Sequence, residues 1–265
     1  MIEKRIEAEV FGVNYERFSL GKQLQRFLKD RDIKTVCELP AHGAKAAPSL
    51  YSLDFALAGV KVTLVNGIEE SLKFYKELGI EKNVEIIKVD NISKTGLEDN
   101  KFDFVWNFAF IPTYKNKIAL LNEMRRISKK HVAVFSVNKR NIGFPLHRFA
   151  HWRTKIPWTH GDIKFNSPSY LKNFFKISGL KNIKTGVVDC PVWPDSVGFR
   201  DIRLHKNNIT FDNIEWQVPY IDYLKNNKYP SWFKYVYFVE KLPLPLCMKY
   251  IYAHIFFVTG IVVES

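Results

Sequence analysis

The fold is decided by residues 36–72, which read VCELPAHGAKAAPSLYSLDFALAGVKVTLVNGIEESL. Apolar runs at residues 35–39 and 61–65 flank a helical pattern at residues 46–58, which Gly59 ends. The two apolar runs show little polar alternation, as expected of strands that are covered on both faces. Because parallel neighbouring strands need a crossover helix between them, this stretch predicts a strand–helix–strand unit.

The same alternation continues along the whole chain. We expect further helices at residues 19–32, 69–78, 115–128 and 167–178, and further strands at residues 84–89, 102–106, 132–137, 183–189 and 250–263. Ser19 would serve as the N-cap of the first helix. The pattern predicts an α/β fold with a doubly wound, mostly parallel sheet of seven strands. We expect one domain over residues 1–265, with insertions at residues 138–165 and 193–246 on the acceptor side or as a lid.

Composition limits the class of protein. The chain has 265 residues, of which 46% are hydrophobic, so it can bury a core and is not mostly disordered. A formal net charge of +13 favours an anionic partner, although scattered lysines could equally serve solubility. Three distant cysteines offer no disulfide framework and no CxxC metal site. The charged start predicts a cytoplasmic protein, and residues 250–263 are too few to cross a bilayer.

The candidate binding residues follow the predicted strands, because ligands of doubly wound sheets bind beyond the carboxyl ends of the strands. They are Pro40, His42 and Gly43 after the first strand, Asn66, Gly67 and Ile68 after the second, Asp90, Asn91 and Ile92 after the third, and Asn107 and Phe108 after the fourth; Glu38, inside the first strand, is a candidate only through the resemblance given below.

The order of elements resembles that of the class I S-adenosylmethionine-dependent methyltransferases, which have a Rossmann-like fold. The resemblance rests on residues 36–72 and on the pieces VEIIKVDNIS, KFDFVWNFA, LLNEMRRISKKHVAVFSV and SPSYLKNFFKISGLKNIKT. It implies S-adenosylmethionine as cofactor, S-adenosylhomocysteine as product and in-line methyl transfer. It also implies that the last strand, in YIYAHIFFVTGIVV, is antiparallel to the others.

The chain departs from the family pattern in two regions, the glycine loop and the residue after the second strand. In the family's glycine loop, bare backbone approaches the methionine part of the cofactor. Pro40, His42 and Ala44 stand at the three glycine places, and Gly43 lies one position off. Asn66 stands where the family has an acid that accepts both ribose hydroxyls, and an amide can accept from only one of them while donating to the other. We therefore expect weaker cofactor binding.

Other candidate positions follow from the same resemblance. Asp90, with Asn91 and Ile92, is expected at the adenine edge, and Asn107 with Phe108 beside the sulfonium. Tyr15 corresponds to an N-terminal aromatic residue that closes over the cofactor. Asp90 and Asn107 could equally be caps or turn formers, and Tyr15 could be a core residue.

The first insertion carries candidate acid–base groups. His147, His151 and His160 are candidates for a general base, or for packing residues, among Lys, Arg and Trp side chains. His147 and His151 have the i, i+4 spacing of metal ligands, but the RFA between them lacks the glutamate of HExxH and no carboxylate lies nearby. We expect no metal.

The sequence is compatible with several methyl acceptors and binding partners. We expect a small-molecule or lipid-like acceptor, with an anionic group favoured, and rank a nucleic acid below it. Peripheral contact with a membrane is compatible with the charge. The alternative is a catalytically inactive methyltransferase-like module that binds or scaffolds an anionic partner. Calorimetric titration with S-adenosylhomocysteine separates the two.

Overall fold

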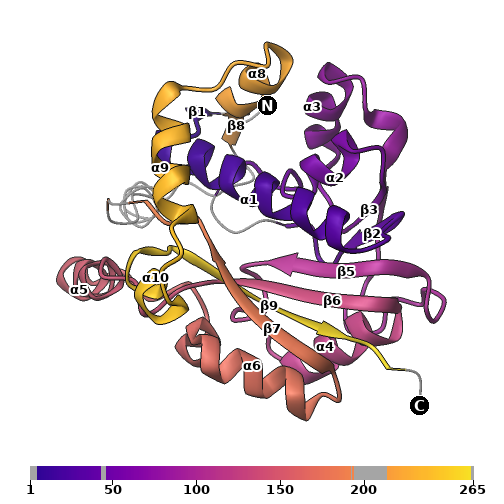
Figure 1. Cartoon of the computed structure of the whole chain (residues 1–265). Helices are drawn as coiled ribbons and strands as arrows, with labels where there is room; N and C mark the ends of the chain where they lie inside the picture. The colour runs from indigo at the N-terminus through magenta and orange to yellow at the C-terminus, as the bar shows by residue number, and fades with distance from the viewer. Residues whose placement is uncertain (1–4, 43–45, 192, 194–213, 264–265) are drawn as a thin grey trace.

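The computed structural model describes residues 5–42, 46–191, 193 and 214–263. Its centre is a seven-stranded sheet in the order β4-β3-β2-β5-β6-β9-β7 (Figure 1), in which only β9 is antiparallel to its neighbours. This confirms the predicted doubly wound sheet and its antiparallel last strand. The strands are β2 (Thr35–Glu38), β3 (Lys61–Val65), β4 (Val84–Ile87), β5 (Phe102–Phe108), β6 (Ser128–Val137), β7 (Lys181–Val188) and β9 (Ile255–Ile261).

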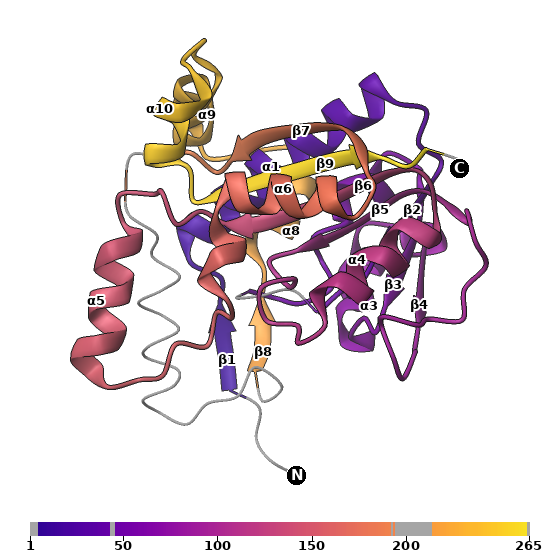
Figure 2. The same cartoon turned by 90° about the horizontal axis from the view of Figure 1, so that it is seen from below.

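Helices cover both faces of this sheet (Figures 1 and 2). One face carries α1 (Phe11–Asp30), α2 (Leu53–Leu57), α3 (Leu72–Glu77), α8 (Pro219–Lys225) and α9 (Ser231–Lys241). The other face carries α4 (Lys117–Arg126) and α6 (Pro168–Ile177), whereas α5 (Phe144–Thr154) and α10 (Leu246–Tyr252) lie at one end. Short 3-10 turns are η1 (Glu69–Ser71), η2 (Glu81–Asn83) and η3 (Ile163–Asn166). A second, parallel pair joins β1 (Arg5–Ala8) to β8 (Ile214–Gln217).

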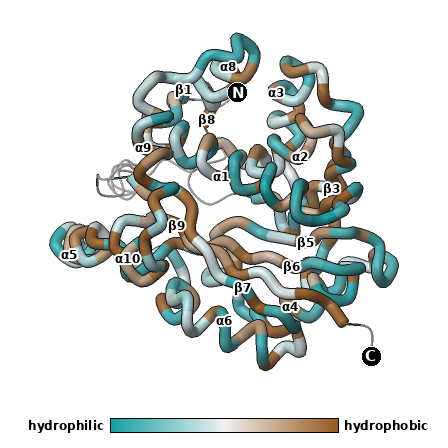
Figure 3. Tube along the Cα trace, viewed as in Figure 1, coloured by the Kyte–Doolittle hydropathy of each residue, from teal (hydrophilic) through white to brown (hydrophobic). Residues whose placement is uncertain are grey.

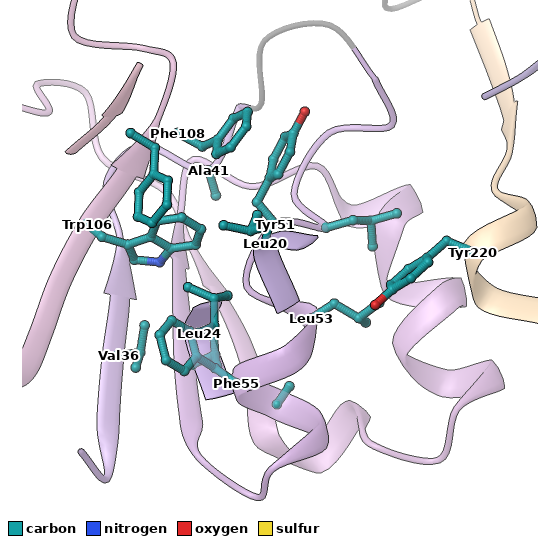
Figure 4. Close-up of a cluster of buried hydrophobic side chains, with 14 of the residues drawn as sticks. Leu20, Leu24, Val36, Ala41, Tyr51, Leu53, Phe55, Trp106, Phe108 and Tyr220 are labelled. Atoms are coloured by element: carbon teal, nitrogen blue, oxygen red, sulfur yellow. The ribbon is translucent and has the colours of Figure 1, made fainter. Parts of the chain in front are cut away.

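Two hydrophobic layers sandwich the sheet. On the α1 side, Leu24 packs with Phe55 and Trp106, all fully buried (Figure 4). On the other side, Leu121 and Met124 of α4 pack with the alternate residues of the strands. Hydrophobic residues accordingly gather along the central strands β5 and β6 (Figure 3). Burial of both faces explains why the strands lack polar alternation in the sequence.

Some predicted boundaries were wrong, and packing is the reason. Helix α1 begins at Phe11 and not after Ser19, because its first half is buried against the rest of the chain. Ser19 lies inside that helix, where its Oγ donates to the Glu240 carboxylate at 2.8 Å, so it is not an N-cap. The helix predicted at residues 46–58 is only the short α2.

Two further boundaries differ at the edge of the sheet. Strand β5 continues through Phe108, so Asn107 and Phe108 belong to the strand and do not follow it. The predicted last strand, residues 250–263, begins with the end of α10, and β9 covers Ile255–Ile261.

The two segments predicted as insertions carry regular structure where the chain is described. The first, residues 138–165, contains α5, and the second, residues 193–246, contains β8, α8 and α9. Among the described residues, no helix has both the length and the apolar character needed to cross a bilayer.

Candidate functional site

A buried carboxyl group ends strand β2. Glu38 is fully buried; Ser52 Oγ donates to its Oε2 at 2.7 Å, and Trp106 Nε1 donates to Ser52 Oγ at 3.0 Å. The other oxygen, Oε1, has no hydrogen-bond partner within the described part of the chain. Burial raises the pKa of Glu38 to about 7. The end of β2 therefore offers one hydrogen-bond acceptor without a partner, Glu38 Oε1, immediately before the divergent loop in the sequence.

The loop after β2 is attached to its neighbours by the backbone. Leu39 N donates to Trp106 O and Ala41 N to Val65 O, each at 2.8 Å, and the Leu39–Pro40 peptide is cis. Pro40 and Ala41 are buried, whereas His42 is exposed, so its imidazole does not fill the interior. Gly43, the only glycine of the loop, lies outside the described residues.

Asn66 connects the ends of β3 and β4. It has a φ of 55°, a left-handed conformation that Asn tolerates better than most residues. Its Nδ2 donates to Val89 O at 3.0 Å, and its Oδ1 accepts from Val89 N at 2.8 Å. Both polar atoms of the Asn66 amide are therefore hydrogen-bonded to the backbone of Val89. No sequence pattern indicates this pair of hydrogen bonds, because they depend on the spacing between two strand ends.

The residues predicted to contact the adenine ring, Asp90, Asn91 and Ile92, follow strand β4. Asp90 is exposed, and Ile92 is 8% exposed, so a solvent-facing carboxylate stands close in sequence to an apolar side chain. Asn91 Oδ1 accepts from Ser93 N at 3.0 Å and from Ser93 Oγ at 2.8 Å. The Asn91 side chain therefore stabilises a turn with Ser93.

The last residues of β5 point to opposite faces of the sheet. Asn107 is fully buried toward α4; its Nδ2 donates to Met124 Sδ at 3.4 Å, and its Oδ1 has no hydrogen-bond partner among the described residues. Phe108 stacks on Tyr51 with ring centroids 3.9 Å apart (Figure 4). The strand pleat separates these two neighbours, so only one of them can face any one ligand.

Tyr15 is a core residue in this structure. Its side chain is fully buried, its hydroxyl donates to Glu240 Oε2 at 3.0 Å, and its ring packs on Trp232 and Phe233. Burial raises its pKa strongly. The aromatic rings that pack against Tyr15, namely Trp193, Trp232 and Phe233, leave no face of its ring available to a cofactor in this conformation.

Sequence reasoning missed a buried polar cluster at the same edge. Glu240 accepts from Ser19 Oγ and Cys190 N, and burial raises its pKa to about 7. Asp189 follows β7, and His254 precedes β9. The distance between Asp189 Oδ2 and His254 Nδ1 is 2.8 Å. These residues come from four separate segments, and no local pattern relates them.

Sequence reasoning also missed a cavity of about 630 Å³ beside Ile68. Its volume is within the range of ligand sites. The lining includes charged and aromatic side chains from beyond β3 and from β8, and among the predicted candidates only Ile68 contributes: Ala47, Pro48, Ile68, Glu69, Glu70, Ser71, Lys73, Phe74, Ile214, Glu215 and Trp216.

The three candidate histidines form one cluster. His147 and His151 lie on α5 with their Nε2 atoms 3.1 Å apart, and the ring centroid of His160 is 5.0 Å from that of His147. Trp158 packs against all three rings. His147 also borders a cavity of about 10 Å³ that Asn138 and His254 line. The spacing of His147 and His151 is visible in the sequence, whereas the approach of His160 depends on the turn that follows α5.

Comparison with known proteins supports one fold family. Residues 46–135 match the profile of a family described as a methyltransferase domain. A sequence search among curated proteins finds no match.

Solved structures extend the likeness to nearly the whole chain. A SAM-dependent methyltransferase from Thermotoga maritima has a TM-score of 0.52 at 12% identity, covering 96% of this chain and 93% of that one. The YcgJ protein from Bacillus subtilis has a TM-score of 0.52 at 16% identity, covering 94% and 99%. A SAM-dependent methyltransferase from Archaeoglobus fulgidus has a TM-score of 0.50 at 15% identity, covering 92% and 94%. At these identities the likeness establishes the fold.

Proposed function

We propose that the chain is a class I S-adenosylmethionine-dependent methyltransferase and that it methylates a lipid-like acceptor at an anionic membrane surface. The cofactor supplies a methyl group on a sulfonium, which an acceptor atom attacks in line. The protein contributes a positioned acceptor, a dry site and groups that hold the cofactor.

The residues at the strand ends fit the cofactor in two places, at Glu38 and at Asp90. The unsatisfied Glu38 Oε1 is a suitable acceptor for the ammonium group of the methionine part. Exposed Asp90 would accept from the adenine edge, with Ile92 as an apolar wall. Asn66 fits less well, because its amide already serves Val89. We therefore assign cofactor recognition chiefly to Glu38 and Asp90.

The observation that carries the choice of acceptor is an exposed apolar surface on α5, α9 and α10, which we call the apolar end. Trp152 of α5 is 73% exposed, and Tyr235 of α9 is 74% exposed. Large hydrophobic side chains left in water over several neighbouring helices are typical of a membrane or protein contact. The other exposed members are Ile142, Leu146, Phe149, Phe238, Val239, Leu244, Met248, Ile251 and Tyr252.

These helices form one end of the molecule. Both cartoon views place α5 and α10 at the same end, with α9 next to α10 (Figures 1 and 2). Two hydrogen bonds join the chain before α5 to α10: Ile142 N donates to Ile251 O at 2.9 Å, and the side-chain Nδ2 of Asn141 donates to Tyr252 O at 2.9 Å. The start of α5 is therefore joined to the end of α10, and the exposed apolar residues of α5, α9 and α10 lie on neighbouring elements.

Charge favours an anionic lipid surface as the partner of the apolar end. Exposed basic residues are interspersed with the apolar ones, namely Arg140, Arg148, Arg153, Lys155, Lys234 and Lys241. Aromatic and aliphatic side chains flanked by Lys and Arg are the pattern of helices that lie in the headgroup region. The net charge of +13 adds a long-range attraction.

The apolar end also borders the expected acceptor side. Helix α5 follows β6, and Asn138, at the carboxyl end of β6, donates from its backbone N to His254 O at 2.8 Å. A lipid whose chains rest on the apolar end would thus present its headgroup toward the carboxyl ends of the strands.

The experiment combines vesicle binding with methyl transfer. Purified protein is sedimented with vesicles of phosphatidylglycerol or of phosphatidylcholine, and with methyl-labelled cofactor the label is measured in the organic extract. The test variant carries Phe149→Glu and Trp152→Glu; the control is Ile177→Glu, an equally exposed apolar residue (73%) on α6. Two aromatic side chains at about 1.5 kcal/mol each predict a loss of about 100-fold in vesicle affinity.

Each outcome has a defined meaning. Binding to phosphatidylglycerol that the double variant loses and the control keeps, with label in the lipid fraction, supports the proposal. Equal vesicle binding by both variants, or label only in water-soluble products, contradicts the lipid-like acceptor in favour of a small molecule. No heat on titration with S-adenosylhomocysteine would point instead to the inactive binding module.

A further inference from the structure

The histidine cluster has the composition of a transition-metal site. A ring nitrogen from each of His147, His151 and His160 lies within 4.8 Å of the other two. His147 and His151 are 6% and 3% exposed. We propose that these three imidazoles bind one divalent transition-metal ion, with Zn²⁺ as the expected occupant, and so fasten the turn after α5 to that helix.

The tautomer of His151 suits ligation. Its Nδ1 lies 3.2 Å from both Ile156 O and Pro157 O, and since a carbonyl oxygen only accepts, Nδ1 carries the hydrogen. In a neutral ring Nε2 then holds the lone pair, and it is this atom that faces His147 Nε2 at 3.1 Å. Donation of one ring N–H to a backbone carbonyl while the other nitrogen binds the ion is the usual arrangement at protein metal sites.

The distances need only a small adjustment. Metal–nitrogen bonds of about 2.0–2.1 Å in a tetrahedron separate two ligand nitrogens by about 3.3 Å. The pair on α5, at 3.1 Å, is already close to that value. The wider gap, of up to 4.8 Å, closes if the partly buried imidazole of His160 shifts by about 1.5 Å while the turn that carries it stays in place.

The surroundings hold His160 in place. Gly161 has a φ of 72°, and a Cβ added there would lie 2.2 Å from Pro112 O, so the turn packs directly on the chain after β5. Asp162 N donates to Pro112 O at 2.9 Å, and Trp158 Nε1 donates to Gly161 O at 3.0 Å. Because these contacts fix the backbone of the turn, binding of an ion by His160 costs little further backbone entropy.

The donor set selects the class of ion. Three neutral imidazoles suit Zn²⁺, Cu²⁺ or Ni²⁺, whereas Ca²⁺ and Mg²⁺ need oxygen ligands. Three protein ligands leave a fourth position for water. The guanidinium of Arg148 stacks on Trp158, 4.7 Å from the ring centroid, and its charge will weaken cation binding without occupying a ligand position.

The test uses full-length protein without a histidine tag, freed of metal with a chelator and titrated with Zn²⁺ against a chromophoric competitor. We expect one equivalent per chain, a visible absorption spectrum of four-coordinate type with Co²⁺, and a higher Tm with Zn²⁺. The variants His147→Gln and His160→Gln should each lose about 100-fold in affinity. The control is His131→Gln, which changes a half-buried histidine on β6.

Either of two results overturns the proposal. One is wild-type protein that takes up less than one equivalent of Zn²⁺; the other is a folded His160→Gln protein that binds as tightly as wild type. Because His147 is buried, its variant could fail to fold for reasons of packing. In that case the stoichiometry and the Co²⁺ spectrum of the wild type, together with the less buried His160 variant, decide.

Discussion

Replacing Asn66 by aspartate tests whether this position serves cofactor binding or the stability of the fold. Judged by the family pattern, Asn66→Asp restores the acid that accepts the ribose hydroxyls, and binding of S-adenosylhomocysteine should tighten. Judged by the structure, the change replaces an N–H donor to Val89 O, at 3.0 Å, with an oxygen. Because Asp tolerates the left-handed conformation as Asn does, the substitution isolates the change from amide to carboxylate. We expect the second effect to dominate.

The magnitude follows from the bond that is lost. A hydrogen bond of this kind contributes about 0.5–1.5 kcal/mol, and an oxygen facing a carbonyl oxygen adds a further electrostatic cost. Both Asn66 and Val89 are half-buried, so water relieves part of that cost. We expect Asn66→Asp to lower the free energy of unfolding by about 1–3 kcal/mol at pH 7, with a fall in Tm of about 2–4 °C per kcal/mol.

The assay is urea unfolding at several pH values, combined with calorimetric titration of S-adenosylhomocysteine. The facing carbonyl raises the pKa of the new carboxyl in the folded protein. Its cost is therefore absent below about pH 4, where the protonated acid donates to Val89 O, and grows as the pH rises. The control is Asn91→Asp, which keeps both acceptor contacts to Ser93 and should leave stability unchanged. A variant at residue 66 that is as stable as wild type at pH 7 and binds the ligand more tightly refutes the reasoning.

Two further predictions concern carboxyl groups. Burial raises the pKa of Glu240 to about 7, from 4.5, so its contribution to stability is present below pH 4.5 and is lost as the pH rises through 7. Wild type should lose about 3 kcal/mol more than Glu240→Gln between pH 4.5 and pH 8 in urea unfolding, and parallel pH profiles of the two proteins would contradict this. Asp90→Ala should weaken S-adenosylhomocysteine about tenfold, or about 1.4 kcal/mol, without a change in Tm; unchanged affinity in calorimetry would remove Asp90 from the cofactor site.

The candidate site was predictable to different extents at different residues. Asp90 is exposed at the end of the third strand of the main sheet, where the sequence placed it. Tyr15 was not predictable, because its partner Glu240 lies 225 residues away. Asn66 was predicted as a polar residue at a strand end, but its attachment to Val89 depends on how the chain continues beyond β4.

The sequence by itself determined the alternation of strands and helices, because apolar spacing and glycine stops are local properties that hold in any packing. It also determined which residues stand at the carboxyl edge, since parallel strands bring their ends together. Only the tertiary structure decided which candidate residues can contact a ligand. Asn66 is engaged by Val89, Tyr15 is enclosed by α9, and His160 is carried to α5 by a turn packed on Pro112. Each outcome depends on contacts between segments whose relative position no local pattern encodes.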